Sequence, residues 1–366
     1  MRLILSLALL TSLFASPQDS SLKQLVESYA EIAYRAYSKT YDETLLLETA
    51  VRNFTENPTE LGLLQCRQQW IKARWAYSQT EVFRFYDGPI DGPLGLETRI
   101  NAWPIDEAFI DYVQHQSTGI ISSYSQHVVA QEFPSINAQA LIELNNNEGG
   151  EQDVCVGFHA LEFLLWGQDL HTESAGTRPL SDFTSASHAH RRCQFLQACS
   201  SLLSLDIVRL VDAWTPDRSN YRQQFLSDPP TGSLRKAIKG MSMLSGFELA
   251  GERLAVPYDT QFQEDEHSCF SDTTHYDLIY NIKGLQNLWF GQYEDYRTLG
   301  LHSIAPPDLS TQISAQLNLC EQLAKAIPEP FDQAILGADD SPNRIAILSC
   351  IRALEHLSSM LSNIPL

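Results

Sequence analysis

The chain has few basic residues, and this shortage excludes several classes of partner. Its 366 residues contain 25 Lys and Arg against 45 Asp and Glu, which gives a formal net charge of −20. Nucleic acids and anionic lipid surfaces are bound through basic patches that neutralise phosphates. We therefore expect neither nucleic acid nor an anionic membrane surface as a partner. An acidic chain instead attracts cations.

Several catalytic and metal-binding motifs are also missing from the sequence. It has no CxxC pair, which excludes a structural zinc site of that kind. It has neither HExxH nor HxxEH, so the usual zinc-peptidase helices are excluded, and neither GxSxG nor a phosphate-binding glycine loop is present. The seven Cys are an odd number, so at least one has no partner within the chain, and the pairing of the others stays open.

Strand-like alternation is scarce, whereas apolar residues recur at helical spacing along most of the chain. Helices are predicted over 22–37, 63–85, 105–113 (with Pro104 in the first turn), 154–166, 188–213, 233–255, 275–290, 309–327 and 342–361. This pattern predicts an all-α fold of packed helical bundles. The length suits two domains, which we place at 17–195 and 196–366.

The N-terminus has the pattern of a signal peptide, which we assign to residues 1–16. Arg2 precedes an apolar run from Leu3 to Ala15, and polar sequence begins at Gln18. The run is short for a transmembrane helix, so cleavage and export are expected, with an uncleaved anchor as the alternative.

The first candidate site is the pair His159 and Glu162. Residues three apart on a helix face the same way, so an imidazole nitrogen and a carboxylate oxygen can share one cation. Gly157 allows another group to approach closely, and the surrounding residues are apolar nearly all round, so the pair is expected to be buried. A buried Glu needs a partner. The alternative is a His–Glu pair that satisfies itself in the core.

Acidic residues in the second half offer additional oxygen ligands. Glu248 and Glu252 lie one turn apart on a predicted helix, where the alternative is an ion pair with Arg253 or Arg99. The polar stretch 264–275 contains four acids and two His, with a solvated acidic loop as the alternative. From this stretch Glu266 and His267 are further candidate ligands, and Asp272 is a candidate pocket residue.

Charged and aromatic residues alternate between positions 74 and 104, a pattern that suits either the lining of a pocket or helix-surface charge around core Trp. The candidate pocket residues of the whole chain are Gly157, Arg74, Trp75, Glu97, Arg99, Trp103, Arg253 and Asp272.

Together these segments resemble the imelysin-like family of insulin-cleaving metallopeptidases and iron-regulated periplasmic proteins. The likeness rests on Gly157-x-His159-x-x-Glu162, on 87–91 with 99–104, and on 175–179, 248–253 and 264–272, in the same order along most of the chain. The resemblance implies two helical-bundle domains with the GxHxxE site near their interface. It also implies residence in the periplasm or cell envelope and a link to iron or another metal.

We therefore interpret the chain as an exported metal-binding protein, with iron as the favoured metal and zinc as the alternative. His159 and Glu162 are the predicted nitrogen and oxygen ligands, helped by Glu248, Glu252, Glu266 or His267. A binding protein is favoured over an enzyme. The alternatives are a metallopeptidase that uses the same His–Glu pair, and an envelope scaffold or a binding protein for another ligand. An envelope transporter is the expected protein partner.

Overall fold

The computed structural model describes residues 17–145 and 152–366, and their regular secondary structure is almost entirely helical. Within these ranges the strands are limited to a short antiparallel hairpin, β1 (Gln292–Tyr293) and β2 (Tyr296–Arg297). The prediction of an all-α fold is confirmed. The predicted signal peptide, residues 1–16, lies outside the described residues.

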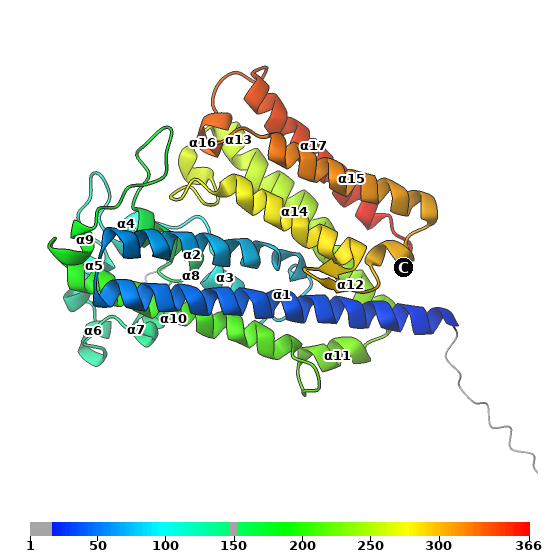
Figure 1. The fold of residues 1–366 in the computed structure, drawn as a ribbon, viewed down its shortest axis with the longest axis horizontal. Coiled ribbons are helices and arrows are strands. Elements are labelled where there is room, and N and C mark those ends of the chain that lie inside the picture. Colours follow the sequence, from blue (N-terminus) through cyan, green and yellow to red (C-terminus); the bar gives the residue numbers. More distant parts are fainter. Residues whose placement is uncertain (1–16, 146–151) are drawn as a thin grey trace, which may run out of the picture.

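Three long helices form the frame of the first half. α1 (Pro17–Glu56) packs along both α2 (Glu60–Ser78) and α10 (Ala189–Trp214), as Figure 1 shows. Thr59 begins α2, because its side chain accepts a hydrogen bond from the backbone N–H of Gly62 at 3.1 Å. The apolar stripe of α1 that the sequence predicts is buried against these partners.

Shorter elements connect α2 to α10, and one of them, α8, is a fully buried helix. They are η1 (Glu81–Phe83), α3 (Leu96–Ile100), α4 (Glu107–Ile110), α5 (Ile120–Ser123), η2 (Tyr124–Gln126), α6 (Val129–Glu132), α7 (Ala138–Leu144), α8 (Gly157–Trp166) and α9 (Ser181–Thr184). The helix predicted over 105–113 is therefore reduced to one turn. Asp106 starts this turn, because its carboxylate accepts from the N–H of Ala108 at 3.0 Å. Asp111 ends it in an extended conformation, with its carboxylate held by Arg178 and Arg192.

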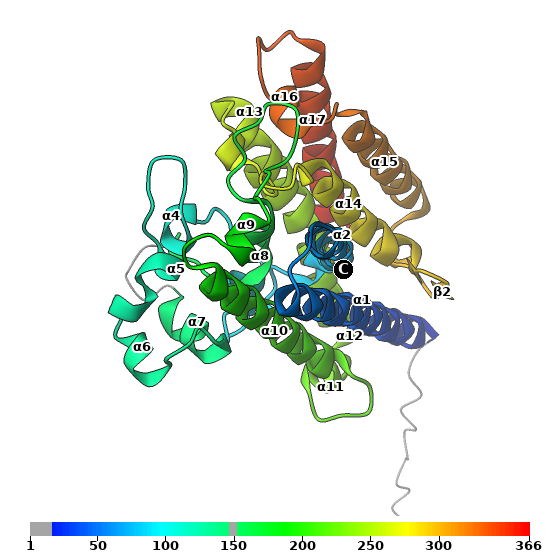
Figure 2. The same cartoon turned by 60° about the vertical axis from the view of Figure 1, so that its left-hand side comes forward.

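The second half forms a further stack of helices. Its elements are α11 (Tyr221–Ser227), α12 (Pro230–Met243), the π-helix η3 (Leu244–Ala255), α13 (Val256–Thr260), η4 (Gln263–Asp265), α14 (Thr274–Phe290), η5 (Leu301–Ile304), α15 (Pro307–Ala326), α16 (Phe331–Ala334) and α17 (Pro342–Ser362). α17 packs on η3 and α15, and α14 lies against α2 of the first half (Figure 2). The predicted domain boundary between residues 195 and 196 falls within α10, and the division into two domains stays a prediction.

The helix predicted over 233–255 changes type at Leu244. From there to Ala255 it is a π-helix, whose backbone hydrogen bonds span five residues rather than four. This spacing brings residues five apart towards the same face, whereas an α-helix would turn them apart. Gly246 allows the close packing of α17, because a Cβ there would lie 2.5 Å from Oγ of Ser358.

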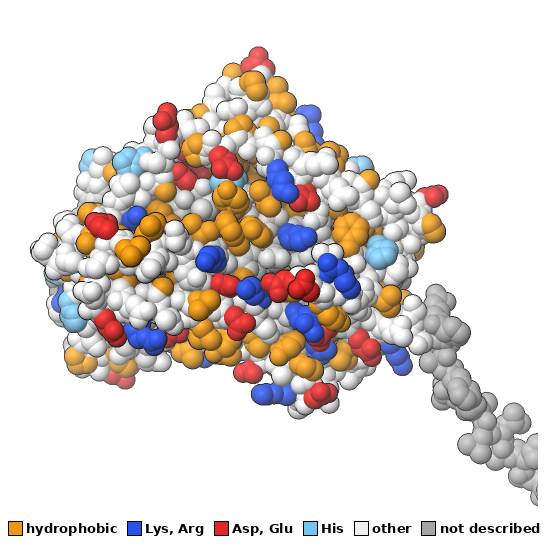
Figure 3. Space-filling view, in the orientation of Figure 1, with side chains coloured by type: hydrophobic (Ala, Val, Ile, Leu, Met, Phe, Trp, Pro, Cys, Tyr) orange, Lys and Arg blue, Asp and Glu red, His pale blue; other side chains and the backbone are white. Residues whose placement is uncertain are grey.

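Two described helices, α10 and α17, are long and apolar enough to cross a membrane by length and composition alone. Much of each is covered by the rest of the protein, as is usual for core helices of this length. Over the face drawn in Figure 3, acidic and basic side chains are interspersed with exposed apolar ones.

Candidate functional site

His159 and Glu162 face each other on α8, a helix in which all ten residues are buried. His159 Nδ1 lies 2.8 Å from Oε2 of Glu162. The other carboxylate oxygen, Oε1, accepts hydrogen bonds from the backbone N–H of Ser271 at 3.0 Å and from its hydroxyl at 2.6 Å. Burial raises the pKa of Glu162 to about 8 and lowers the pKa of His159 well below its usual range. The imidazole is therefore neutral.

The second ring nitrogen of His159 is the exceptional atom of this pair. Nε2 is buried and has no hydrogen-bond partner among the described residues. A pair that satisfied only itself would account for Nδ1 and leave this nitrogen unexplained. A carboxylate on one imidazole nitrogen, with the other nitrogen free, is the usual arrangement of a metal-binding histidine.

Gly157 fixes where α8 begins. Its φ is +86°, a left-handed conformation that favours glycine, and a Cβ there would lie 2.6 Å from the carbonyl oxygen of Ile100. The start of α8 thus packs directly on the end of α3. Trp70 of α2 adds a hydrogen bond from Nε1 to the carbonyl of Phe158 at 2.9 Å, which holds the next residue of the helix.

Two rings cover His159. The ring centroid of His267 is 4.7 Å away, and that of Trp103 is 4.9 Å away. His267 Nδ1 lies 3.0 Å from Oδ2 of Asp277 and 2.8 Å from Nη2 of Arg74. Burial, together with the nearby arginines, lowers the pKa of His267 well below its usual range. Two neutral imidazoles therefore meet, each with a carboxylate beside its Nδ1.

Arg74 and Asp277 connect α2 to α14 behind these rings. The guanidinium donates from Nε and Nη2 to the two carboxylate oxygens, at 3.0 and 3.1 Å, and both side chains are buried. Arg74 also donates to Oδ1 of Asn101. A bidentate pair of this kind fixes both groups in position and leaves no net charge.

A second buried ion pair joins Glu81 to Arg253. Glu81 accepts from both terminal nitrogens of Arg253, and from the side-chain amides of Asn101 at 3.2 Å and Asn281 at 3.0 Å. Burial alone would raise the pKa of Glu81, but the charge and hydrogen bonds of Arg253 lower it to about 2. Asn101 bonds to both Arg74 and Glu81, so the two ion pairs form one network between the halves of the chain.

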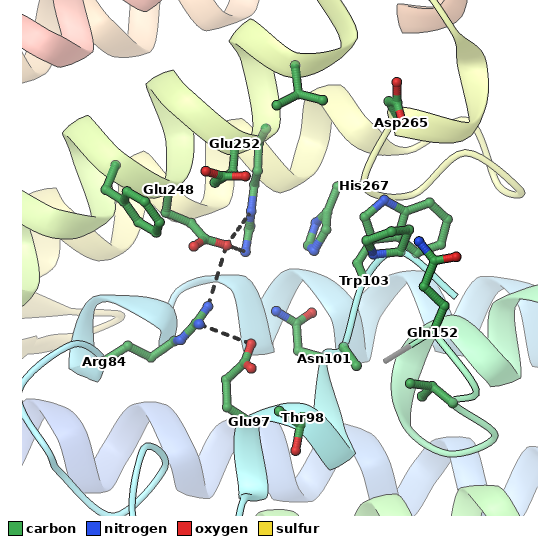
Figure 4. A pocket seen from close by; sticks show the side chains of 16 residues that line it. Arg84, Glu97, Thr98, Asn101, Trp103, Gln152, Glu248, Glu252, Asp265 and His267 are labelled. Carbon is green, nitrogen blue, oxygen red and sulfur yellow. Dashed lines mark hydrogen bonds and ion pairs between the residues drawn. The ribbon is translucent and has the colours of Figure 1, made fainter. Parts of the chain in front are cut away.

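A cavity of about 870 Å³ opens in front of this network, between α3 with the segment after it and η3 with residues 265–267 (Figure 4). Its lining residues are Arg84, Glu97, Thr98, Asn101, Ala102, Trp103, Pro104, Gln152, Val154, Phe247, Glu248, Glu252, Arg253, Val256, Asp265 and His267. His159 is not among them. It lies behind Trp103 and His267, which both line the cavity and contact its ring.

Ion pairs neutralise the two arginines of the wall. Arg84 lies 3.1 Å from Glu97 and 3.5 Å from Glu248, and Arg253 lies 2.8 Å from Glu248 (Figure 4). The π-helix places Glu248 and Arg253 on one face although they are five residues apart. Glu248 is therefore in an ion pair with Arg253, as the alternative interpretation expected, whereas Glu252 is exposed at the cavity.

Of the predicted site residues, six line the cavity: Glu97, Trp103, Glu248, Glu252, Arg253 and His267. Arg74, Gly157, His159 and Glu162 lie in the buried layer behind it. Two other residues, Trp75 and Arg99, have different surroundings. Trp75 stacks on Tyr280, with ring centroids 5.0 Å apart, and Nη2 of Arg99 lies 2.9 Å from Oδ2 of Asp206.

Glu266 and Asp272 belong to an acidic cluster with Asp169 and Asp332. Glu266 is buried, and its Oε1 has no hydrogen-bond partner among the described residues. Burial and the neighbouring carboxylates raise the pKa of Glu266 well above its usual range and the pKa of Asp272 to about 7. The consecutive residues Glu266 and His267 thus have different neighbours, acidic groups for one and Arg74 with His159 for the other.

Sequence reasoning misses Asp277 and Asn281, which anchor the two arginines. Both are buried on α14, four residues apart and therefore on one face. Two polar residues at this spacing, set among the buried apolar residues Leu278, Ile282 and Leu285, are the signal that marks a buried polar contact.

The donor atoms of the site fit part of a metal coordination shell. Nε2 of His159 has no hydrogen-bond partner among the described residues, and the contact between Nδ1 and Glu162 fixes the direction of the ring. The ring of His267 is adjacent. The described ranges, 17–145 and 152–366, contain no group of three or more His, Cys, Asp or Glu side chains that could hold a metal ion. Protein side chains in these ranges therefore supply at most two neighbouring imidazoles.

Comparison with known proteins confirms the resemblance seen in the sequence. The model of the imelysin family, peptidase family M75, matches residues 33–361, so the chain belongs to the imelysin family. It is 27% identical over 354 residues to "Iron-regulated protein A" of Synechococcus elongatus, covering 92% of this chain and 81% of that protein.

Two solved structures share the fold. One is a putative iron-regulated protein A precursor from Parabacteroides distasonis, with a TM-score of 0.70, 18% identity and 95% of each chain covered. The other is an imelysin-like protein from Psychrobacter arcticum, with a TM-score of 0.62, 12% identity and 94% of each chain covered.

Proposed function

We propose that this protein binds a metal ion as its cargo, with Nε2 of His159 as a ligand. The observation that supports the proposal is a neutral, buried imidazole nitrogen that has no partner, on a ring held by Glu162. Unsatisfied buried polar atoms are costly, so a nitrogen kept in this state calls for a ligand. Imidazole nitrogen suits iron, which the name of the Synechococcus relative favours, and zinc is the alternative.

In this proposal Glu162 orients the ring of His159 through Nδ1. His267 is the second imidazole, because its ring faces that of His159. Among the acids predicted as further ligands, Glu252 faces the cavity, Glu248 is committed to Arg253 and Arg84, and Glu266 belongs to the acidic cluster. Glu162 is fully buried and does not line the cavity, so it is not placed to act as a base on a peptide held there. This favours binding over catalysis.

Export belongs to the same proposal. The predicted signal peptide would deliver the protein to the periplasm or cell envelope, and an envelope transporter is the partner that would receive the metal. Secretion of the full chain with loss of the N-terminal residues would support this, and retention of an intact cytoplasmic chain would contradict it.

The proposal is tested by metal binding to wild type and to His159→Asn. The Asn amide can still donate a hydrogen bond to Glu162 but offers no Nε2. We expect the affinity for Fe²⁺, measured by calorimetry under anaerobic conditions, to fall at least tenfold while the melting temperature changes little. His190→Asn is the control, because His190 is exposed. Equal affinity in wild type and His159→Asn would refute the proposal.

A further inference from the structure

The cavity in front of the two ion pairs has side chains whose surface a bound molecule can reach. Its volume of about 870 Å³ lies within the roughly 300–1,000 Å³ of sites for small organic ligands. The exposed or half-buried side chains that this molecule meets include Trp103, Phe247, Glu252, Val256 and Asp265. His159 lies behind this lining, so recognition in the cavity is independent of the metal proposed at that residue.

The two arginines of the cavity wall are already outnumbered by their partners. Arg84 lies 3.1 Å from Glu97 and 3.5 Å from Glu248. Arg253 pairs with Glu248 and with Glu81. Three carboxylates therefore share two guanidinium groups, whose side chains are only 11% and 3% exposed. Neither arginine is available to an anionic molecule, and no arginine of the lining is left for a further carboxylate.

Two further carboxylates line the cavity, on Glu252 and Asp265. Glu252 belongs to η3 and Asp265 ends η4, and Figure 4 shows the two side chains apart from each other. In the part of the chain that the structure describes, neither carboxylate has an ion-pair or hydrogen-bond partner. Because they lie apart, a compact cation contacts one of them at a time. Two separate cationic groups are needed to neutralise both.

The cavity also exposes apolar surface beside these charges. Phe247 is 51% exposed and Val256 is 39% exposed, although both line the cavity. The half-buried ring of Trp103 adds to this surface. Removing apolar surface from water is favourable, and a hydrocarbon chain achieves this whereas a hydrated ion does not. The lining thus suits a molecule that combines separated positive charges with a hydrocarbon segment.

We propose that the cavity binds a linear organic diamine or polyamine. One ammonium group pairs with Glu252 and another with Asp265. The methylene chain between them covers Phe247 and Val256. Two charges on one chain make the second ion pair intramolecular, so both pairs form for a single loss of translational freedom. A monoamine lacks the second charge, and a divalent metal ion lacks both the separation and the chain.

The test is calorimetry on the purified full chain at physiological ionic strength, with putrescine, cadaverine and spermidine as probes. Pentylamine and Mg²⁺ are the references, because the first has the chain of cadaverine with one charge and the second has two charges without a chain. We expect one site, with the best of the three probes bound at least about tenfold more tightly than pentylamine. Equal affinity for pentylamine, or displacement by equimolar Mg²⁺, would overturn the proposal.

Variants assign the binding to this cavity. Glu252→Gln and Asp265→Asn are each expected to reduce the affinity for the best probe to about that of pentylamine, because one ion pair remains. Asp259→Asn is the matched control, since Asp259 is an exposed acid of α13 that does not line the cavity. Phe247→Ser is expected to weaken cadaverine and pentylamine alike, because it removes apolar surface only. An equal loss in all three acid variants would indicate general surface charge and overturn the proposal.

His159→Asn separates the amine site from the metal site. Its affinity for the best probe is expected to stay within about twofold of wild type, while its affinity for Fe²⁺ falls. Amine binding that persists beside an unchanged affinity for Fe²⁺ would refute the metal ligand and support the amine site. Fe²⁺ binding that depends on His159 in a protein that binds none of the three probes would overturn the amine site alone.

Discussion

Replacing Glu81 by Gln is expected to destabilise the protein strongly, because Arg253 would lose its main partner in the interior. Glu81 is fully buried, and its pKa of about 2 lies about 2.5 pH units below its ordinary value. At 1.36 kcal/mol per unit this corresponds to about 3 kcal/mol of stability at pH 7. Breaking a buried ion pair by removing one partner typically costs about 3–5 kcal/mol, which agrees.

The pH dependence provides a second check on the same substitution. Because the folded-state pKa of Glu81 is depressed, its contribution is fully present above pH 4.5 and is lost as the pH falls towards 2. The difference in unfolding free energy between wild type and Glu81→Gln, from urea titrations, should therefore fall by more than half between pH 7 and pH 3.

A matched control uses the other carboxylate on Arg253. The side chain of Glu248 is 15% exposed, and Arg253 keeps Glu81 when Glu248 is replaced. Glu248→Gln is therefore expected to cost about 1 kcal/mol or less. Equal costs for the two variants, or a Glu81→Gln effect that does not change with pH, would refute the assignment of Glu81 as the principal counter-ion.

Three further predictions concern stability. Gly157→Ala should cost about 2–3 kcal/mol in a urea titration, because a Cβ would clash with the backbone of Ile100; an unchanged midpoint would contradict this. Trp70→Phe should cost about 1–2 kcal/mol by losing the bond to Phe158. The pKa of Asp272 is raised to about 7, so the folded protein favours the protonated carboxyl group. Ionisation of Asp272 therefore lowers the stability of the fold as the pH rises from about 4 through 7. Asp272→Asn should therefore melt above wild type at pH 8 but not at pH 4.

The long helices were predictable because their burial follows a simple period. The apolar repeats over 275–290 and 342–361 match α14 and α17 to within one residue at each end. Elements whose first and last residues depend on side-chain hydrogen bonds were not predictable in this way. The helix expected over 105–113 is shortened by Asp106 and Asp111, and periodicity does not report such contacts.

The candidate site was predictable only in part, for a similar reason. His159 and Glu162 are three residues apart, so helical geometry alone brings them together. Arg74 and Asp277 are 203 residues apart, and their contact exists only because α2 packs against α14. The change to a π-helix at Leu244 decides which side chains of η3 line the cavity. The apolar repeat of the sequence does not predict this change.

The π-helix has a consequence for how the length of this chain can vary in evolution. Each of its backbone hydrogen bonds spans one residue more than those of an α-helix, so deleting one residue can restore an α-turn without displacing the flanking helices. A deletion between Glu248 and Arg253 would leave them four apart, a spacing that an α-helix aligns. The ion pair between Glu248 and Arg253 and the flanking helices would then both be kept. Single-residue gaps in relatives are therefore expected to concentrate in 249–252.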